Sequence, residues 1–443
     1  MIPPRHLLWL ALFLSADICL AQQADTHIPK PTPAEEAALF IPPGFDKPGA
    51  AKQATGNDVG HVKIQVQESE TGQRTFCRIN VIGSDGNFYQ PVQNYLTKYN
   101  LTGTWPKTGW GNRDGKGPFR YYGRYFYSWG DAAVAVPPGK VRIEVWKGNE
   151  YRPEVREVTV DVGKEKLVSI PLQHTMNLPR ENYFSGDSHL HFNRTSDAEE
   201  QLALDLLEAE GVHYGMLLAY NEPAGPYTGI MSTLASPQDR GMGRKSTLTR
   251  NGYAITSGQE YRSGTYGHLN LYQRDALVLT GEKRDANNWP IYGTLAHDTI
   301  KSGGYAWYAH GGYSQEIYAD FVQGNLSAVE LLQFGHYRGI QLSDWYHILN
   351  IGYRLPIIGA SDFPACRKMC DCVTYVRLDH GKDISDWLAG AAGDAALSPP
   401  AQGCSGSGRT QTRGRDCDQL SRSPNSQSQN PSPLEVAPVT ASI

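Results

Sequence analysis

Two histidines separated by one residue are the strongest chemical feature of this chain. His189 and His191 follow Asp187 at alternate positions. If residues 184–191 form a strand, these three side chains point to the same face. Imidazole is a good ligand for zinc, iron, nickel and manganese, and a nearby carboxylate can orient an imidazole or bind the ion itself. The motif predicts a metal site, with two ordinary histidines on the polar face of a strand as the alternative.

Three further metal-capable side chains each follow a short apolar run that is typical of a buried strand. They are Glu260 after residues 253–257, His310 after 305–309 and Asp362 after 356–359. In barrels of alternating strands and helices, active sites are built at the carboxyl ends of the strands. We therefore expect His189, His191, Glu260, His310 and Asp362 to hold divalent metal ions.

Other polar residues lie close to these candidates in the sequence. His268 is expected to act as a further ligand or as a proton shuttle, with a structural histidine as the alternative. His336 follows the apolar run 328–332 and is expected to contact the substrate, with a structural histidine as the alternative. Arg262 would hold an anionic group of a small-molecule substrate, although a surface ion pair is the more ordinary role.

Such a metal centre would activate water. A bound zinc ion lowers the pKa of its water from 15.7 to about 7 and polarises a carbonyl or phosphoryl oxygen. Asp187 or Asp362 could then carry protons between the water and the leaving group. The expected reaction is hydrolysis of an ester, carbamate or phosphoester bond.

The rest of the chain must position these side chains. Arg5 and His6 precede a short apolar run, and small residues end at Ala21, which predicts a signal peptide over residues 1–21 and a secreted or periplasmic protein. The apolar run is too short to cross a bilayer. A net charge of −4 and the lack of a Lys/Arg cluster argue against a nucleic-acid partner.

Changes in local composition and hydrophobic periodicity divide the chain of 443 residues into further segments. Residues 22–60 are rich in Pro, Ala and Gly and predict a linker or arm. Alternating runs over 61–178 predict a β-sandwich with a long aromatic insertion between Tyr95 and Trp129. Strands and helices then alternate over 179–391, which predicts a parallel sheet, open or closed into a barrel.

The C-terminal residues differ from the rest. Residues 392–443 are dominated by Ser, Pro, Gly, Gln and Arg, which predicts a disordered tail. Just before them, Cys366, Cys370 and Cys372 are bunched. In an exported protein a local disulfide is favoured over a zinc knot.

The motifs resemble those of a known family. Gly186 to His191, together with Glu260, His310 and Gly359 to Asp362, is similar to the metal motifs of the PHP (polymerase and histidinol phosphatase) superfamily, in particular its carbaryl-hydrolase-like (CehA/McbA) branch. The stretch 61–178 resembles a carboxypeptidase-regulatory-like domain. The resemblance implies a distorted (β/α)7 barrel after a β-sandwich, with two or three ions of zinc, manganese or iron.

Two features depart from that family. The place of its second-strand Thr-Asp-His motif reads Ala219 to Glu222, so that Asn221 would replace a ligand or contact substrate. The barrel would also be incomplete at its C-terminal end, because low-complexity sequence begins where a further strand is expected; a frameshift after Trp387 would explain this.

The sequence thus predicts a secreted metal-dependent hydrolase. A non-catalytic secreted binding protein with a decayed barrel is the alternative, and a phosphatase acting on small organic phosphates is a third reading of the same residues. The substrate, the metal and the oligomeric state stay open.

Overall fold

The computed structural model describes twelve stretches of the chain. They are residues 52–96, 99, 101–102, 124–220, 240–263, 266–278, 291–310, 316–333, 336–337, 342–363, 368–379 and 382–393. The predicted signal peptide, most of the linker, Asn221 and nearly all of the predicted tail lie outside these stretches. In the described part of the chain, no helix is both long enough and apolar enough to span a bilayer.

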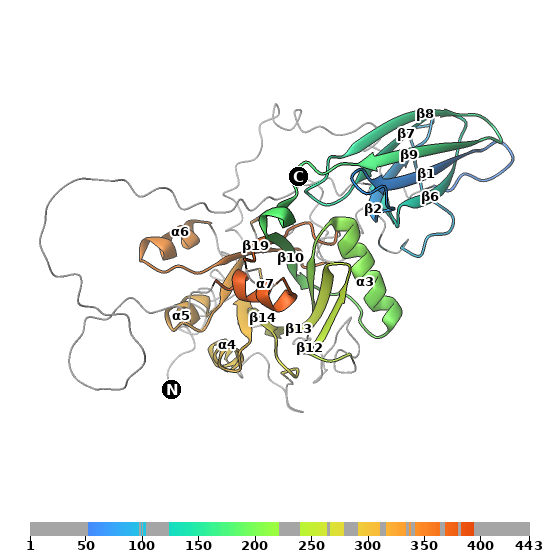
Figure 1. Cartoon of the computed structure of the whole chain (residues 1–443). Coiled ribbons are helices and arrows are strands. Elements are labelled where there is room, and N and C mark those ends of the chain that lie inside the picture. Colours follow the sequence, from blue (N-terminus) through green and yellow to red (C-terminus); the bar gives the residue numbers. More distant parts are fainter. Residues whose placement is uncertain are drawn as a thin grey trace, which may run out of the picture.

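Two sheets form the first half of the described chain. One has three strands, in the order β6 (Asp131–Val136), β1 (Gly60–Glu68) and β9 (Glu165–Leu172). The other has β4 (Leu101–Thr102), β5 (Arg124–Ser128), β2 (Cys77–Ile82), β7 (Gly139–Trp146) and β8 (Glu154–Val160) in that order, with β3 (Phe88–Tyr89) beside β2. These two sheets lie together at the upper right of Figure 1.

Alternation of apolar and polar residues builds the core between these sheets. Along β1 the side chains of Val62, Ile64 and Val66 are fully buried, while the residues between them are more exposed. Ile79 on β2 and Ile143 on β7 meet them in the same apolar cluster. This is the period-2 pattern of strands with one buried face. The boundaries 61–178 of a separate domain stay a prediction.

The predicted aromatic insertion was partly wrong. β5 lies within the stretch from Tyr95 to Trp129 and pairs antiparallel with β2, so this part of the stretch belongs to the sheet. Three consecutive aromatic side chains of β5 are buried because one face of the strand contacts the sandwich core and the other faces helix α3 (Asp197–Glu210). Residues 103–123 lie outside the described chain.

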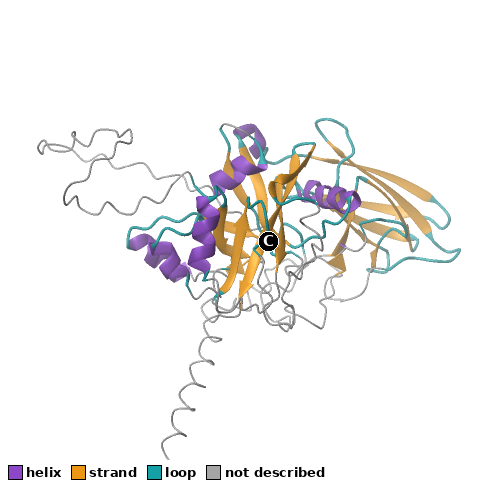
Figure 2. Ribbon diagram, turned by 90° about the horizontal axis from the view of Figure 1, so that it is seen from below, coloured by secondary structure: helices purple, strands orange, loops and turns teal. Residues whose placement is uncertain are grey.

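A large mixed sheet forms the second half. Its order is β17 (His336–Tyr337), β16 (Ala328–Gln333), β15 (Tyr305–Tyr308), β14 (Gly267–Tyr272), β13 (Tyr253–Ser263), β11 (Tyr214–Tyr220), β10 (Tyr183–Leu190) and β19 (Thr374–Arg377). β12 (Gly243–Arg250) pairs with β13, and β18 (Ile357–Ala360) pairs with β16. Strand ribbons predominate over helices in Figure 2.

The pairing in this sheet contradicts the predicted (β/α)7 barrel. β10–β11, β11–β13, β15–β16 and β16–β18 are parallel, but β13–β14, β14–β15 and β10–β19 are antiparallel. A barrel of regular strand–helix units has parallel neighbours throughout, because a helix carries the chain back before each new strand. β13 and β14 are instead neighbouring antiparallel strands only three residues apart, which leaves no room for a crossover helix.

Helices cover parts of this sheet. α3 begins after Ser196, whose hydroxyl accepts a hydrogen bond from the N–H of Glu199, and ends at Gly211 in the left-handed region (φ 63°). The other helices are short: α4 (Tyr292–Lys301), α5 (Ile317–Val322), α6 (Leu342–Asn350) and α7 (Ile384–Ala391). A 3-10 turn, η2 (Leu178–Glu181), connects the two halves of the chain.

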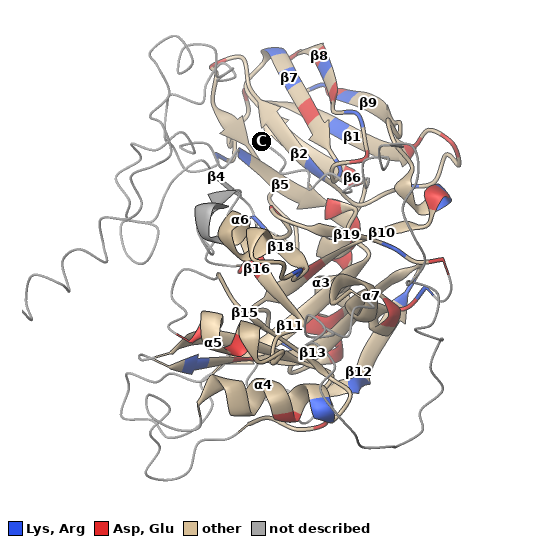
Figure 3. Ribbon diagram, turned by 90° about the vertical axis from the view of Figure 1, so that its left-hand side faces the viewer, with Lys and Arg blue, Asp and Glu red and all other residues tan. Residues whose placement is uncertain are grey.

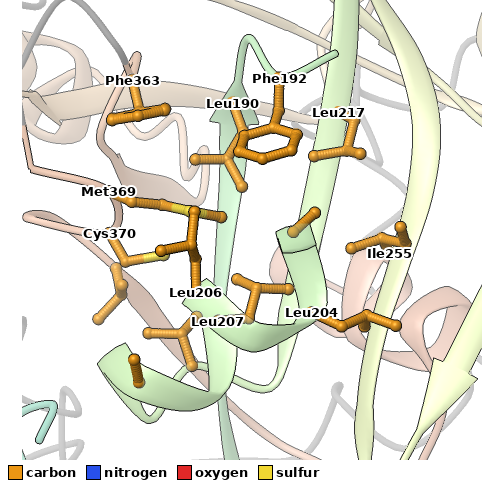
Figure 4. Packing of buried hydrophobic residues seen from close by; sticks show 14 of the residues in the cluster. Leu190, Phe192, Leu204, Leu206, Leu207, Leu217, Ile255, Phe363, Met369 and Cys370 are labelled. Carbon is orange, nitrogen blue, oxygen red and sulfur yellow. The ribbon is translucent and has the colours of Figure 1, made fainter. Parts of the chain in front are cut away.

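Helix α3 packs between the two halves. Its Leu204, Leu206 and Leu207 contact apolar side chains from β10, β11 and β13 (Figure 4). At its C-terminal end, Glu210 accepts a hydrogen bond from Tyr127 of β5 (2.5 Å) and pairs with Arg78 of β2 (3.3 Å). Helix α3 thereby connects strands β10, β11 and β13 to the sandwich.

Helix α7 braces β10 from another side. Trp387 is fully buried and its indole N–H donates to the carbonyl of Phe184 (2.9 Å). A side chain in place of Gly186 would meet this ring at 2.5 Å, so the indole requires glycine in the strand that leads to His189. Residues after 393 lie outside the described chain, so the predicted frameshift is not tested.

Candidate metal centre

The structure brings the five predicted ligands together. Two overlapping groups form, and in each the potential ligand atoms all lie within 4.8 Å of one another. One group is His189, His191 and Asp362, and the other is His189, Glu260 and His310. All five residues are buried, with at most 8 % of any of them exposed. The two groups share His189, so the cluster can be filled by one ion or by two neighbouring ions.

Both histidines of the opening motif point the same ring nitrogen into the cluster. Nε2 of His189 and Nε2 of His191 are 3.1 Å apart. Two nitrogens at 2.0–2.1 Å from a tetrahedral zinc ion are separated by roughly 3.3 Å. The observed spacing fits two imidazoles that share one ion.

The opposite nitrogens of these rings are held by neighbours. Nδ1 of His191 lies 2.9 Å from the carbonyl oxygen of Leu218, and Nδ1 of His189 lies 3.1 Å from a carboxylate oxygen of Glu330. An N–H at Nδ1 leaves Nε2 with its lone pair, which is the tautomer that binds a metal. The arrangement favours metal binding over ordinary buried histidines.

Glu260 supplies a carboxylate in the centre of the cluster. Its Oε1 lies 2.8 Å from Nδ1 of His268, 3.3 Å from Nε2 of His310 and 3.5 Å from Nε2 of His189. Within the described residues this oxygen has no hydrogen bond of acceptable geometry. A buried carboxylate oxygen facing three imidazole nitrogens matches the donor set that divalent transition metals prefer.

Two of the five candidates have strained backbones. His310 (φ 36°) and Asp362 (φ 54°) adopt positive φ directly after β15 and β18. Non-glycine residues rarely adopt this region, and such strain concentrates at functional sites because the surroundings must hold it in place. The conformation turns both side chains toward His189: Nε2 of His310 lies 3.8 Å from Oδ2 of Asp362, and Oδ1 of Asp362 lies 3.4 Å from Nε2 of His189.

Electrostatics within the cluster are strongly coupled. Burial alone would lower the pKa of His189, but the carboxylates of Glu330, Asp362 and Glu260 raise it well above its ordinary value. Burial would raise the pKa of Glu260, but the Arg262 guanidinium and the imidazoles of His268 and His189 hold it well below its usual range. The pKa of Asp362 is also lowered, by the surrounding histidines.

Arg262 closes one side of the cluster. Its guanidinium pairs with Oε2 of Glu260 (2.6 Å) and lies over the ring of Tyr220, 3.9 Å from the ring centre. A nitrogen of the same group lies 3.4 Å from Nε2 of His191. Arg262 is therefore held beside the cluster by an ion pair and a cation–π contact.

Asp187 lies beside the cluster but faces the backbone. Its Oδ1 accepts hydrogen bonds from the N–H groups of His189 and Ser361, both at 3.1 Å. Burial raises its pKa to about 6, while the bonds from Ser361 and His189 oppose that rise. The carboxyl group ties β10 to the loop that carries Asp362.

The remaining sequence candidates are placed as follows. His268 lies on β14, with Nδ1 3.1 Å from Nε2 of His310, and burial lowers its pKa. His336 lies on β17, paired with Gln333. Cys370 and Cys372 have free thiols, and Cys366 lies outside the described chain.

Sequence reasoning missed Glu330 and Asn270. Glu330 is fully buried; it lies against His189, accepts the N–H of His310 (2.9 Å) and accepts the amide of Asn270 (2.8 Å). The sequence contained a sign of its role, because Glu330 is the one charged residue in the apolar run that forms β16. A charge inside a buried strand requires a partner, and the partner here is a metal-capable histidine.

Comparisons with known proteins found distant structural likenesses. No family model and no curated protein matches. PsfC from Pseudomonas syringae has a TM-score of 0.33 and 15 % identity over 47 % of this chain and 88 % of that one. A minor pilin of Streptococcus agalactiae has a TM-score of 0.18 and 11 % identity over 27 % of this chain and 46 % of the pilin. A streptococcal ancillary pilin has a TM-score of 0.18 and 12 % identity over 31 % of this chain and 37 % of the pilin.

The strand pairing corrects the family assignment. β13–β14 and β14–β15 are antiparallel, whereas the strands of a (β/α)7 barrel are parallel to their neighbours. The predicted membership of the PHP superfamily and its carbaryl-hydrolase-like branch was therefore wrong. The prediction of a metal-dependent hydrolase is corrected together with this assignment, whereas the roles of Asp187 and His268 stay predictions.

Proposed function

We propose that this chain is a non-catalytic, exported binding protein that holds a divalent transition-metal ion in the buried cluster around His189. The observation that carries the proposal is the convergence of His189, His191, Glu260, His310 and Asp362 in a buried cluster. Export rests on the predicted signal peptide over residues 1–21.

A structural role for the ion follows from the number of protein ligands. Catalytic zinc sites keep a coordination position open for water or substrate, whereas structural sites are closed by four protein ligands. Five side chains from β10, β13 and the ends of β15 and β18 are enough to close such a shell. The ion would join strands that are distant in sequence and offset the repulsion among Glu260, Glu330 and Asp362.

The charge balance also fits a bound cation. Figure 3 shows acidic segments inside the second half of the molecule, where Glu260 and Glu330 are fully buried. Buried charges are costly unless they are paired or bind a metal. Arg262 neutralises part of this charge, and the ion would neutralise the rest.

Calorimetric titration of the chelator-treated full chain with zinc or manganese tests the proposal. Wild type should bind stoichiometrically, and His191→Ala with Asp362→Asn should bind at least about a hundredfold more weakly. His174→Ala is the matched control, because His174 lies in the sandwich half and belongs to neither ligand group. Absence of saturable binding to wild type would refute the metal site.

A second measurement tests the non-catalytic role. Aryl esters, carbamates and phosphoesters are incubated with metal-loaded wild type and with His189→Ala. Equal background rates are expected from both proteins. A rate that depends on the metal and disappears in His189→Ala would refute the non-catalytic role and leave metal binding standing.

A further inference from the structure

A cleft in the sandwich half lies beside a sheet edge, distant in sequence from the ligand residues. It has a volume of about 560 Å³ and is lined by β6, by the segment from Pro91 to Tyr95 and by Trp129. Specific ligand sites commonly have volumes of this order. Neither the metal cluster nor the predicted active site accounts for it.

The strand beside the cleft is an open edge. Among the described residues β6 pairs only with β1, in a continuous register from Gly60 opposite Val136 to Gln65 opposite Asp131. Proteins protect such edges with bulges, prolines or charged side chains. β6 begins with the charged residue Asp131, but residues 132–136 are Ala, Ala, Val, Ala and Val, with no charge and no proline.

Exposed apolar side chains gather at the same cleft. Val92 is 68 % exposed, Tyr95 57 % and Trp129 49 %. The hydroxyl of Tyr95 donates to Asp205 of α3 (3.0 Å), so its ring is fixed in place. A group of exposed apolar side chains beside a cleft marks a surface that another molecule covers.

Three polar side chains of the cleft, those of Asn94, Ser128 and Asp131, are already engaged. Asn94 donates to the carbonyl of Tyr127 (2.8 Å) and accepts from the N–H of Leu96 (3.0 Å). The carboxylate of Asp131 is paired with Arg74 (2.8 Å). A sugar would need free side-chain donors and acceptors, whereas an added strand needs the backbone of β6. The neutralised carboxylate favours an uncharged ligand.

We propose that this cleft binds an extended, uncharged peptide segment of another protein as an additional strand on the edge of β6. Backbone hydrogen bonds along β6 would provide affinity, and the apolar side chains at alternate positions of the segment would contact Val92, Tyr95 and Trp129. The small side chains of Ala132, Ala133 and Ala135 let the added backbone approach. The proposal does not depend on the metal cluster.

Calorimetry with the full chain tests this proposal with a blocked decapeptide of alternating valine and threonine. A second peptide of the same sequence carries N-methyl groups at every backbone nitrogen and cannot donate to the ladder from either of its edges. The first peptide should bind and the second should bind at least about tenfold more weakly, because strand addition depends on backbone donors.

Two variants locate the site. Trp129→Ala should weaken binding of the first peptide about tenfold, as truncation of an aromatic anchor commonly does. Ala133→Glu places a charge on the edge and opposite Lys63, where the new pair preserves the fold, and it should also weaken binding. Leu167→Ala is the matched control, since Leu167 is 56 % exposed on β9, at the other edge of the same sheet.

Four results would overturn the proposal. They are no binding of the first peptide at millimolar concentration, equal binding of the N-methylated peptide, saturable binding of a β-linked glucose hexasaccharide that Trp129→Ala abolishes, and dimerisation of the free chain that Ala133→Glu abolishes. The last two would assign the cleft to a glycan or to a second copy of this chain.

Discussion

The two halves of this molecule differ in the side chains that they bury. The sandwich core is built mainly from Val, Ile, Leu and aromatic side chains, and Lys147, one of its buried cations, is paired with Glu68 (3.1 Å). The second half buries three imidazoles and three carboxylates around His189. The first arrangement is stabilised by removal of apolar surface from water, whereas the second is costly without a further partner. This difference supports the proposal that the second half binds a metal ion at its polar centre.

The largest effect should come from an apolar truncation in the sandwich. Ile79→Ala removes a fully buried side chain and should lower the free energy of unfolding by about 2–5 kcal/mol. The loss should be the same with and without metal, which denaturant unfolding in zinc and in chelator can check. A loss that depends on metal would mean that the two halves do not differ as described.

Metal removal should act on the other half alone. With free metal at about 100 times its dissociation constant, chelation should cost about 2.7 kcal/mol. Hydrogen exchange should then accelerate at β10 and β13 and stay unchanged at β1 and β7. Uniform acceleration in both halves would contradict the comparison.

Glu330→Gln should weaken metal binding about ten- to a hundredfold, because the carboxylate that orients His189 is lost while the shape is kept. Competition with a chromogenic chelator measures this. Asp320→Asn is a suitable control, since Asp320 is a buried carboxylate that accepts from Tyr308 (2.6 Å) and belongs to neither ligand group. Equal metal affinities of the Glu330 and Asp320 variants would show that Glu330 does not orient His189 for metal binding.

A change of a single pH unit should have the smallest effect on binding. In the metal-free protein the carboxylates of Glu330, Asp362 and Glu260 raise the pKa of His189 well above its ordinary value against the effect of burial, so the ring holds its proton more tightly than a free imidazole does. Its proton stabilises the metal-free fold below that ordinary value, and this stabilisation is lost as the pH rises through the raised pKa. Metal must displace the proton, so affinity should fall by up to about tenfold for each pH unit below the raised pKa.

Titrations in buffers of different ionisation enthalpy would measure the proton released on binding. The pKa of His213 is lowered to about 4 by burial, so this histidine is already uncharged near neutral pH and releases nothing. An affinity that is independent of pH would show that His189 is not a ligand.

Apolar runs were sufficient to predict several strands. The runs at 305–309, 328–332 and 356–359 correspond to β15, β16 and β18, because strand formation follows from the local pattern. Pairing did not follow, since neighbours in a sheet are set by contacts distant in sequence. The resulting barrel prediction failed where β13 and β14 run antiparallel.

Polar residues were the other source of error. Glu260 was placed beyond a strand ending at Ser257, yet β13 continues to Ser263. Polar side chains end an apolar run in the sequence, but they stay inside a strand when buried partners such as His268 and Arg262 satisfy them. Glu330 escaped notice for the same reason, because its partner His189 lies 141 residues away.

Metal content of the purified full chain tests the central claim most directly. Wild type and His189→Ala are produced in metal-replete medium, passed through the same desalting column and analysed by plasma mass spectrometry. The account predicts stoichiometric zinc, manganese or iron in wild type and a small fraction of it in His189→Ala, with His174→Ala equal to wild type. Wild type without stoichiometric metal, or equal metal in wild type and His189→Ala, would contradict it.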